Sequence, residues 1–239
     1  MPGIIVQLLL SWLIIWLFEK GNLKVLGFYP TKKRLIGFAI FFIITALCCS
    51  TDFFMRMLFA QQQWQLNPKL NANLVLTGIW WNIKSVLFEE LIFRGVLFYI
   101  LIKKLGHNKA IILSAIAFGI YHWFSHEVFG DPVQMLITFL VTGTMGLVYA
   151  FAYSKTFSLY YPIAIHLGWN LTSSVIFSKG ILGNQLFTQV KPVPEVQVGY
   201  FVYFCFAFIP LLSAILINYV MLKRLRQQPT PHQRSPHNQ

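Results

Sequence analysis

The sequence predicts an all-α fold, a polytopic transmembrane helical bundle of about seven spans. Of the 239 residues, 56% are hydrophobic and only 11% are charged, whereas a soluble domain has about 25% charged residues. The mean hydropathy is +0.62. A helix that crosses a membrane needs about 20 apolar residues, and stretches near this length recur at 4–18, 35–59, 74–102, 109–124, 132–154, 157–178 and 199–222.

The segments around these stretches support the same division. The first stretch lacks a basic leader and a small-residue cleavage site, so it predicts a span rather than a cleaved signal peptide. A polar loop at 61–73, a basic turn at 103–109 and an acidic loop at 125–132 separate later stretches. We therefore expect a single transmembrane domain over 1–222. The Pro-rich end of the chain predicts a disordered cytoplasmic tail over 223–239.

The basic residues lie between the apolar stretches, not on one patch, so the net charge of +12 does not predict a nucleic-acid partner. They do predict an orientation, because Lys and Arg concentrate on the cytoplasmic side of membrane proteins. One predicted side holds Lys20, Lys24, Lys32, Lys33, Arg34, Lys103, Lys104, Lys109, Lys155, Lys223, Arg224, Arg226 and Arg234; the other holds Arg56, Lys69, Lys179 and Lys191. The N-terminus is then outside and the C-terminus cytoplasmic.

Three charged residues interrupt the third apolar stretch, in "VLFEELIFRG". A charge at the centre of a membrane helix costs roughly 2.5–3.5 kcal/mol on insertion scales. Glu90 and Arg94 are spaced i, i+4, so they share a helix face and can neutralise each other. Glu89 points about 100° away from Glu90 and therefore needs a partner from another helix.

Two other stretches offer polar side chains spaced one helical turn apart. Phe118 and His122 lie near the end of one, and His166 and Asn170 lie within another. At 1.5 Å per residue, Glu89 and these polar residues are all roughly 15–20 Å below the cytoplasmic surface. This alignment predicts one site formed by three central helices. Hydrogen bonding between helices is the alternative interpretation.

A carboxylate beside two histidines and an amide is suited to activating water. Glu89 can act as general base with His122 holding the same water. His166 and Asn170 can donate hydrogen bonds to a developing oxyanion, an effect of roughly 3–4 kcal/mol per donor. This chemistry is peptide-bond hydrolysis without a covalent intermediate.

Motifs of other protease classes are missing. The sequence has no H-E-x-x-H and no G-x-S-x-G motif, and Asp52 and Asp131 lie at the edges of spans, not within them. The cysteines Cys48, Cys49 and Cys205 are odd in number and have no C-x-x-C spacing, so neither disulfides nor a zinc knuckle is expected.

The three motifs "EELIFR" (89–94), "FGIYH" (118–122) and "HLGWN" (166–170), in this order on separate apolar stretches, resemble the CPBP family of intramembrane proteases. This family includes the type II CAAX prenyl proteases and the bacteriocin-processing and immunity (Abi) proteins. The resemblance covers about 78–178, the expected protease-like core. It implies a glutamate-dependent intramembrane endopeptidase, historically classed as a metalloendopeptidase, in the cell membrane.

By match to the family motifs, the resemblance implies a catalytic set and a supporting set. The first contains Glu89, Glu90, His122, His166 and Asn170, and the second contains Arg94 and Phe118. Glu89 would be the base and His122 would hold the water with it. Glu90 would orient the first motif helix together with Arg94.

Metal dependence stays open, because Glu89, His122 and His166 could bind zinc. The asparagine favours an oxyanion role, so no obligatory cofactor is expected. The expected partners are the lipid bilayer and a membrane-associated peptide or protein tail, lipidated or not. The short loops suggest a bacterial inner membrane. His126 and Glu127, after the fourth stretch, are interpreted as a solvated loop in preference to a rim of the site.

Two other functions fit the same residues. A proton-coupled transporter would use the intramembrane carboxylate and histidines as a proton relay. A non-catalytic immunity or scaffold protein would use the same fold only to bind a partner.

Overall fold

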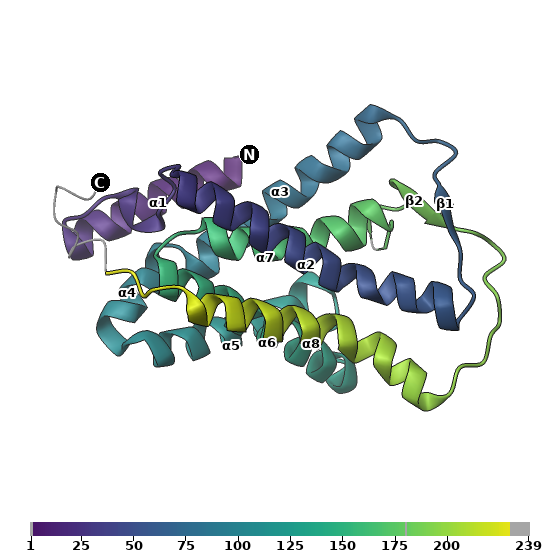
Figure 1. Cartoon of the computed structure of the whole chain (residues 1–239). Helices are drawn as coiled ribbons and strands as arrows, with labels where there is room; N and C mark the ends of the chain where they lie inside the picture. The colour runs from purple at the N-terminus through teal and green to yellow at the C-terminus, as the bar shows by residue number, and fades with distance from the viewer. Residues whose placement is uncertain (1, 180, 230–239) are drawn as a thin grey trace. The chain divides into compact units, whose positions relative to one another are not determined.

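The computed structural model describes residues 2–179 and 181–229, and it is helical apart from one short pair of strands (Figure 1). The elements in chain order are α1 (Pro2–Glu19), the 3-10 helix η1 (Leu23–Leu26), α2 (Lys32–Phe59), β1 (Trp64–Leu66), α3 (Ala72–Arg94), α4 (Val96–Leu105), α5 (His107–Ser125), α6 (Pro132–Thr156), α7 (Tyr160–Leu171), the π-helical turn η2 (Thr172–Ile176), β2 (Phe187–Gln189) and α8 (Tyr200–Arg224).

Four helices are long and apolar enough to cross a membrane among the residues that the structure describes: α1, α2, α6 and α8. They confirm a helical integral membrane protein, as the composition predicts. Many of their large apolar side chains are exposed, which suits contact with lipid. The total of seven spans stays a prediction.

The predicted third span is not one continuous helix, and this expectation was wrong. α3 ends at Arg94 and α4 begins at Val96, with Gly95 between them at φ −81° and ψ −145°. A Cβ on Gly95 would lie 2.0 Å from the carbonyl oxygen of Leu91. Only glycine fits this break, and a hydrophobicity pattern does not reveal it because the apolar run continues on both sides.

The chain forms two compact units. The first consists of residues 1–38, 87–163 and 218–239, and the second of residues 39–86 and 164–217. The helices α2, α3, α7 and α8 each contribute residues to both. The units are described separately below.

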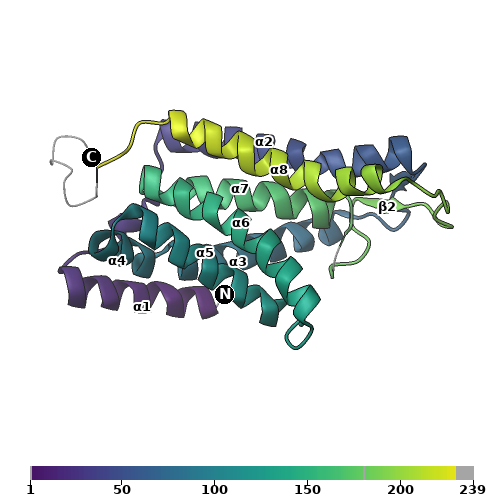
Figure 2. The same ribbon diagram turned by 90° about the horizontal axis from the view of Figure 1, so that it is seen from below.

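The first unit is built around the packing of α5 on α6, with α1 lying along α4 (Figure 2). A Cβ on Gly119 would lie 2.7 Å from the Phe139 ring, so this glycine lets α5 and α6 approach closely. The indole nitrogen of Trp123 donates to the Met135 carbonyl at 2.8 Å. Asp131 caps the start of α6 by accepting from two backbone N–H groups.

The second unit holds α7 against α2. A Cβ on Gly168 would lie 2.5 Å from the Phe42 carbonyl oxygen. At its polar end, β1 and β2 pair antiparallel over three residues each. This pair was not predicted, because three-residue strands inside polar loops have too short a pattern to recognise.

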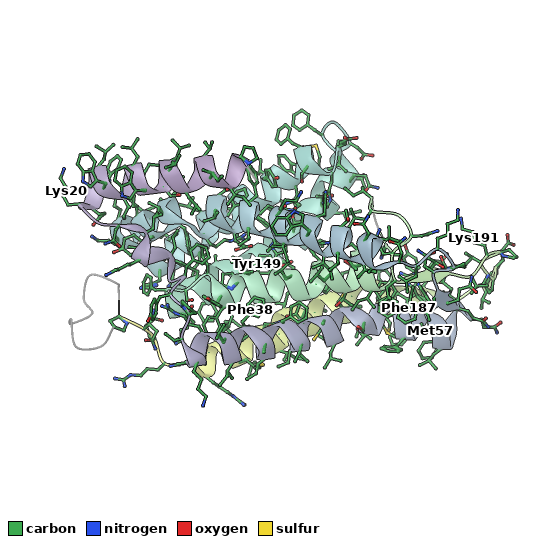
Figure 3. All side chains as sticks on the ribbon, turned by 90° about the horizontal axis from the view of Figure 1, so that it is seen from above. Lys20, Phe38, Met57, Tyr149, Phe187 and Lys191 are labelled. Atoms are coloured by element: carbon green, nitrogen blue, oxygen red, sulfur yellow. The ribbon has the colours of Figure 1, made fainter. Side chains whose placement is uncertain are left out.

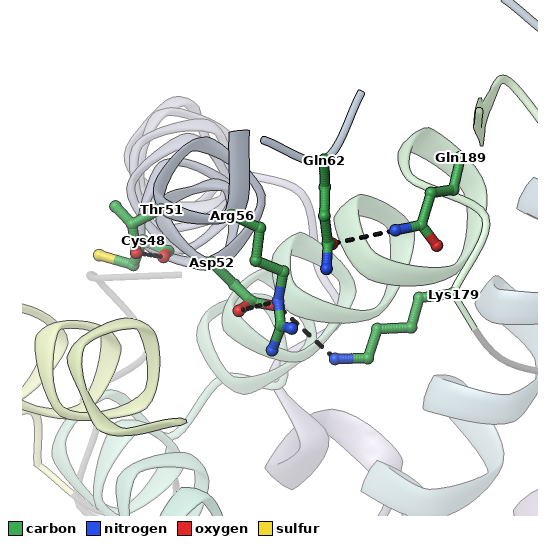
Figure 4. A network of polar contacts seen from close by, with 7 residues as sticks. All are labelled: Cys48, Thr51, Asp52, Arg56, Gln62, Lys179 and Gln189. Atoms are coloured by element: carbon green, nitrogen blue, oxygen red, sulfur yellow. Dashed lines mark hydrogen bonds and ion pairs between the residues drawn. The ribbon is translucent and has the colours of Figure 1, made fainter. Parts of the chain in front are cut away.

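An ion cluster also lies in the second unit, near the end of α2 (Figure 4). Asp52 contacts Arg56 at 2.7 Å and Lys179 at 3.5 Å. The Arg56 side chain is 31% exposed and that of Asp52 is 11% exposed. The charged side chains of this cluster are therefore partly exposed to solvent.

The predicted disordered tail begins inside α8, which runs to Arg224. Beyond it, Gln227 donates from its side chain to the Ser154 carbonyl at 2.8 Å, and the Gln228 N–H donates to the Lys155 carbonyl at 3.0 Å. The described part of the tail is therefore fixed to the end of α6. Residues 230–239 lie outside the described residues.

Candidate active site

Glu90 and Arg94 form a fully buried ion pair in the first unit, as their spacing predicts. Arg94 Nη1 lies 3.2 Å from Glu90 Oε1, and both side chains are 0% exposed. Arg94 Nη2 also donates to the Gly146 carbonyl on α6 at 3.1 Å. Its guanidinium carbon lies 4.2 Å from the centre of the Phe118 ring and 5.1 Å from that of Tyr149, which is labelled in Figure 3.

This arrangement makes Arg94 the link between α3, α5 and α6. The pair neutralises charge, the carbonyl accepts a charge-assisted hydrogen bond and the aromatic faces attract the cation. Gly146 makes the approach possible, because a Cβ there would lie 3.1 Å from both Arg94 Nη2 and the Phe118 ring. Arg94 and Phe118 are thus in direct contact, and their supporting role in the site stays a prediction.

Glu89 and His122 face each other in the same unit. Glu89 Oε2 lies 3.9 Å from His122 Nε2, and the two side chains are 12% and 9% exposed. On the other side of the imidazole, His122 Nδ1 lies 2.7 Å from the Phe118 carbonyl oxygen. A carbonyl only accepts, so Nδ1 carries a proton and Nε2 is the ring nitrogen that faces Glu89.

Aromatic rings surround His122. The Phe118 ring centre lies 4.4 Å from that of His122, and the Tyr121 ring meets it edge-on at 5.3 Å. The His126 ring is also edge-on, at 5.1 Å. These contacts fix the orientation of the imidazole.

His126 is an exposed residue of the turn that follows α5, in agreement with its interpretation as a solvated loop residue, and its ring still contacts that of His122. Its i, i+4 spacing from His122 favours this contact, because α5 continues to Ser125 and keeps both rings on one face. Partial burial lowers the pKa of His126 below its usual value.

His166 and Asn170 lie on α7 in the second unit. His166 is 5% exposed, and the Asn170 carbonyl accepts from Ser174 Oγ at 2.6 Å. Ser174 Oγ is also 3.2 Å from Oδ1 of Asn82 on α3, a buried residue that the sequence motifs did not indicate. The predicted meeting of His166 and Asn170 with Glu89 and His122 stays a prediction.

Directly after α7 comes the π-helical turn η2. Such turns are rare and are frequently found at functional sites. The third motif, "HLGWN", ends at Asn170, and α7 ends at Leu171. The motif thus lies beside this irregular helical segment.

Within 2–179 and 181–229, no group of three or more His, Cys, Asp or Glu side chains is placed to hold a metal ion. Glu89 and His122 of the first unit offer two ligands, and His166, the third predicted one, lies in the second unit. A catalytic zinc ion takes three ligands from the protein, so metal dependence stays open.

The comparisons with known proteins agree with the three motifs. Residues 71–172 match the family model described as type II CAAX prenyl endopeptidase Rce1-like. No curated protein and no solved structure matches the chain. The matched stretch contains all three motifs, and it supports an intramembrane endopeptidase that acts on a membrane-associated protein. The resemblance inferred from the motifs is thus confirmed: residues 71–172 are similar to the CPBP (CAAX protease) family.

Proposed function

We propose that this protein hydrolyses a peptide bond in a membrane-associated peptide or protein tail, with water activated by Glu89. The observation that carries the proposal is the Glu89–His122 pair. Its separation of 3.9 Å is too long for a direct hydrogen bond and suits a water that bridges both groups. A bridging water would donate one proton to the carboxylate and one to Nε2, which leaves a lone pair for attack.

The reaction follows from these positions. The water oxygen bonds to the carbonyl carbon of the substrate while Glu89 takes one proton from that water. The carbonyl oxygen becomes an oxyanion. When the carbon–nitrogen bond breaks, the proton on Glu89 passes to the leaving amine, and a carboxylic acid and an amine are released.

In this proposal His166 and Asn170 supply the hydrogen bonds to the oxyanion. Each such donor typically contributes about 3–4 kcal/mol to the transition state. The catalytic residues Glu89, His122, His166 and Asn170 then come from three membrane helices in a bundle of seven spans. The site that they form opens toward the cytoplasmic leaflet. No metal ion is required by any of these steps.

Glu90 has a different role from Glu89 in this proposal. Its side chain is 0% exposed and is held by Arg94, so it has no access to a substrate. It acts as a positioning residue, because the pair fixes the turn of α3 that carries Glu89. Glu89 thus takes part in the reaction, and Glu90 stabilises the helical turn that carries Glu89.

The test is cleavage of a library of free and farnesylated peptides by the purified full chain, followed by mass spectrometry. Glu89→Gln keeps the size of the side chain and removes the base, so products should fall at least 100-fold. Glu195→Gln is the matched control, since Glu195 is an exposed loop residue. A chelator arm measures metal dependence separately.

Products that persist in Glu89→Gln at the wild-type rate would refute the proposed base. A folded wild-type protein that cleaves no peptide in either library would favour the transporter or scaffold functions. A proton-flux assay in liposomes then separates these two.

A further inference from the structure

A second feature of the first unit is a pocket of about 830 Å³ at the ends of α2, α6 and α8. Its lining includes four cationic side chains and, among the residues described, no acidic one: Lys24, Lys33, Arg34 and Arg226. Two exposed residues with hydroxyl groups, Tyr29 and Thr31, are also part of the lining. The pocket is therefore electropositive and equipped with neutral hydrogen-bonding groups.

One wall is a preformed segment that contains η1. The backbone carbonyls of Val25 and Gly27 accept hydrogen bonds from Tyr153 Oη at 2.6 Å and Ser158 Oγ at 3.1 Å. Gly27 has φ +65°, and a Cβ on it would lie 2.3 Å from the Phe157 carbonyl oxygen. This wall is thus fixed in place before any ligand binds.

The opposite wall is the segment after α8, which contributes Arg226. Hydrogen bonds from Gln227 and Gln228 to the end of α6 hold this segment. Between the two walls, Arg34 Nη1 donates to the Tyr29 carbonyl at 2.6 Å, which places its guanidinium beside the pocket.

The N-terminus of α2 adds to the positive potential. Thr31, which directly precedes α2, and Lys33 from its first turn line the pocket. The first backbone N–H groups of a helix lack intrahelical partners and favour negative charge. The Arg34 N–H is already capped by Thr31 Oγ1, so an anion in this pocket would meet mainly the side-chain cations, in the positive potential of the helix end.

The pocket also lies where two membrane helices end. α2 and α8 are both long and apolar enough to span a bilayer, and the pocket is at the start of one and beyond the end of the other. Phe28 and Tyr29 flank it, and Tyr29 is 74% exposed. Aromatic and basic residues together are typical of the membrane–water interface.

We propose that this pocket binds the headgroup of an anionic phospholipid. Its position on the Lys-rich side of the protein matches the cytoplasmic leaflet, where anionic lipids concentrate and basic pockets bind their headgroups. The cations contact the phosphate, and the exposed hydroxyl groups of Tyr29 and Thr31 contact the polar part of the headgroup. The acyl chains extend along the apolar surfaces of the adjoining helices. A soluble phosphate ester shares the phosphate chemistry but gains nothing from these surfaces.

The experiment measures lipid binding to the purified full chain in detergent by native mass spectrometry. The probes are phosphatidylglycerol, phosphatidylcholine and the soluble headgroup glycerophosphoglycerol. The pocket variant is Lys33→Gln with Arg226→Gln, and Lys33→Gln alone is the milder version. The matched control, Lys104→Gln with Lys109→Gln, removes the same charge from the same predicted side outside the pocket.

Phosphatidylglycerol should bind more tightly than phosphatidylcholine. The pocket double variant should weaken its binding about 30-fold and the single variant about fivefold, whereas the control should change it less than about threefold. The melting temperature of each variant should stay near that of the wild type, because Lys33 and Arg226 are exposed. An equal loss in the control, or no preference over phosphatidylcholine, would overturn the proposal. Binding of glycerophosphoglycerol as tight as that of the lipid would assign the pocket to a soluble phosphate ester instead.

Discussion

Replacing Arg94 by methionine tests the main structural argument, because it leaves Glu90 buried without its cation. Both side chains of this pair are 0% exposed. Breaking a buried pair by removing one partner costs about 3–5 kcal/mol. For a chain of this length such a loss lowers the melting temperature by about 10 °C or more. Thermal unfolding of the purified protein in detergent measures it.

The double variant Glu90→Gln, Arg94→Met separates the charge from the other contacts. With both charges removed, the remaining cost comes from the lost hydrogen bond from Arg94 Nη2 to the Gly146 carbonyl, 3.1 Å in the structure, and from the lost contacts of the guanidinium with the Phe118 and Tyr149 rings. A hydrogen bond to a charged donor contributes about 1.5–3 kcal/mol. The double variant should therefore be more stable than Arg94→Met alone. Simple additivity of the two single variants would refute the argument.

The pair in the second unit provides a matched control within the chain. Asp52 and Arg56 have the same i, i+4 spacing, but Arg56 is 31% exposed and Lys179 lies 3.5 Å from the same aspartate (Figure 4). A partly exposed pair typically contributes about 0.2–1 kcal/mol. Arg56→Met should therefore lower the melting temperature by only a few degrees. If Arg56→Met lowered the melting temperature as much as Arg94→Met does, the i, i+4 spacing of an ion pair, and not its burial, would determine its contribution to stability.

Three further variants test close contacts by thermal unfolding and activity. Gly146→Ala should destabilise the protein by about 1–3 kcal/mol, because its Cβ would press on Arg94 and Phe118, while Gly199→Ala, with open space around it, should have little effect. Gly27→Ala should lower the free energy of unfolding by at least about 2 kcal/mol more than Gly183→Ala does. Both glycines have positive φ, but only at Gly27 would the added Cβ also collide with a backbone oxygen. His122→Phe should reduce peptide cleavage at least 100-fold with a nearly unchanged melting temperature; a wild-type rate would remove His122 from the mechanism.

Much of the helical architecture could be predicted because it depends on local patterns. Long apolar runs indicated membrane helices, and i, i+4 spacing indicated the Glu90–Arg94 pair. The break at Gly95 could not be predicted, since it depends on the backbone path and not on hydrophobicity. The β1–β2 pair was missed for a related reason, because its partners are far apart in the chain.

The candidate site was predictable to the extent that its residues are intramembrane polar groups. Glu89 and His122, placed on different spans by the sequence, do face each other at 3.9 Å. The Phe118 carbonyl that orients the imidazole could not be recognised from the side-chain motif, because a backbone acceptor has no residue type. The ring contact between His126 and His122 depends on how the turn after α5 is formed, which the sequence does not reveal.

The position of Gly146 shows why charged residues in hydrocarbon cannot be understood from their own helix alone. Local spacing explains how Glu90 neutralises Arg94, but not how Arg94 is accommodated. That depends on a backbone carbonyl and a missing Cβ on α6, and on an aromatic face on α5. The same Phe118 that packs on Arg94 holds His122 through its carbonyl. Loss of Arg94 therefore disturbs both the fold and the imidazole, so reduced activity in an Arg94 variant does not identify a catalytic group. Only a variant that keeps the fold and removes one reacting atom, as Glu89→Gln does, can assign the chemistry.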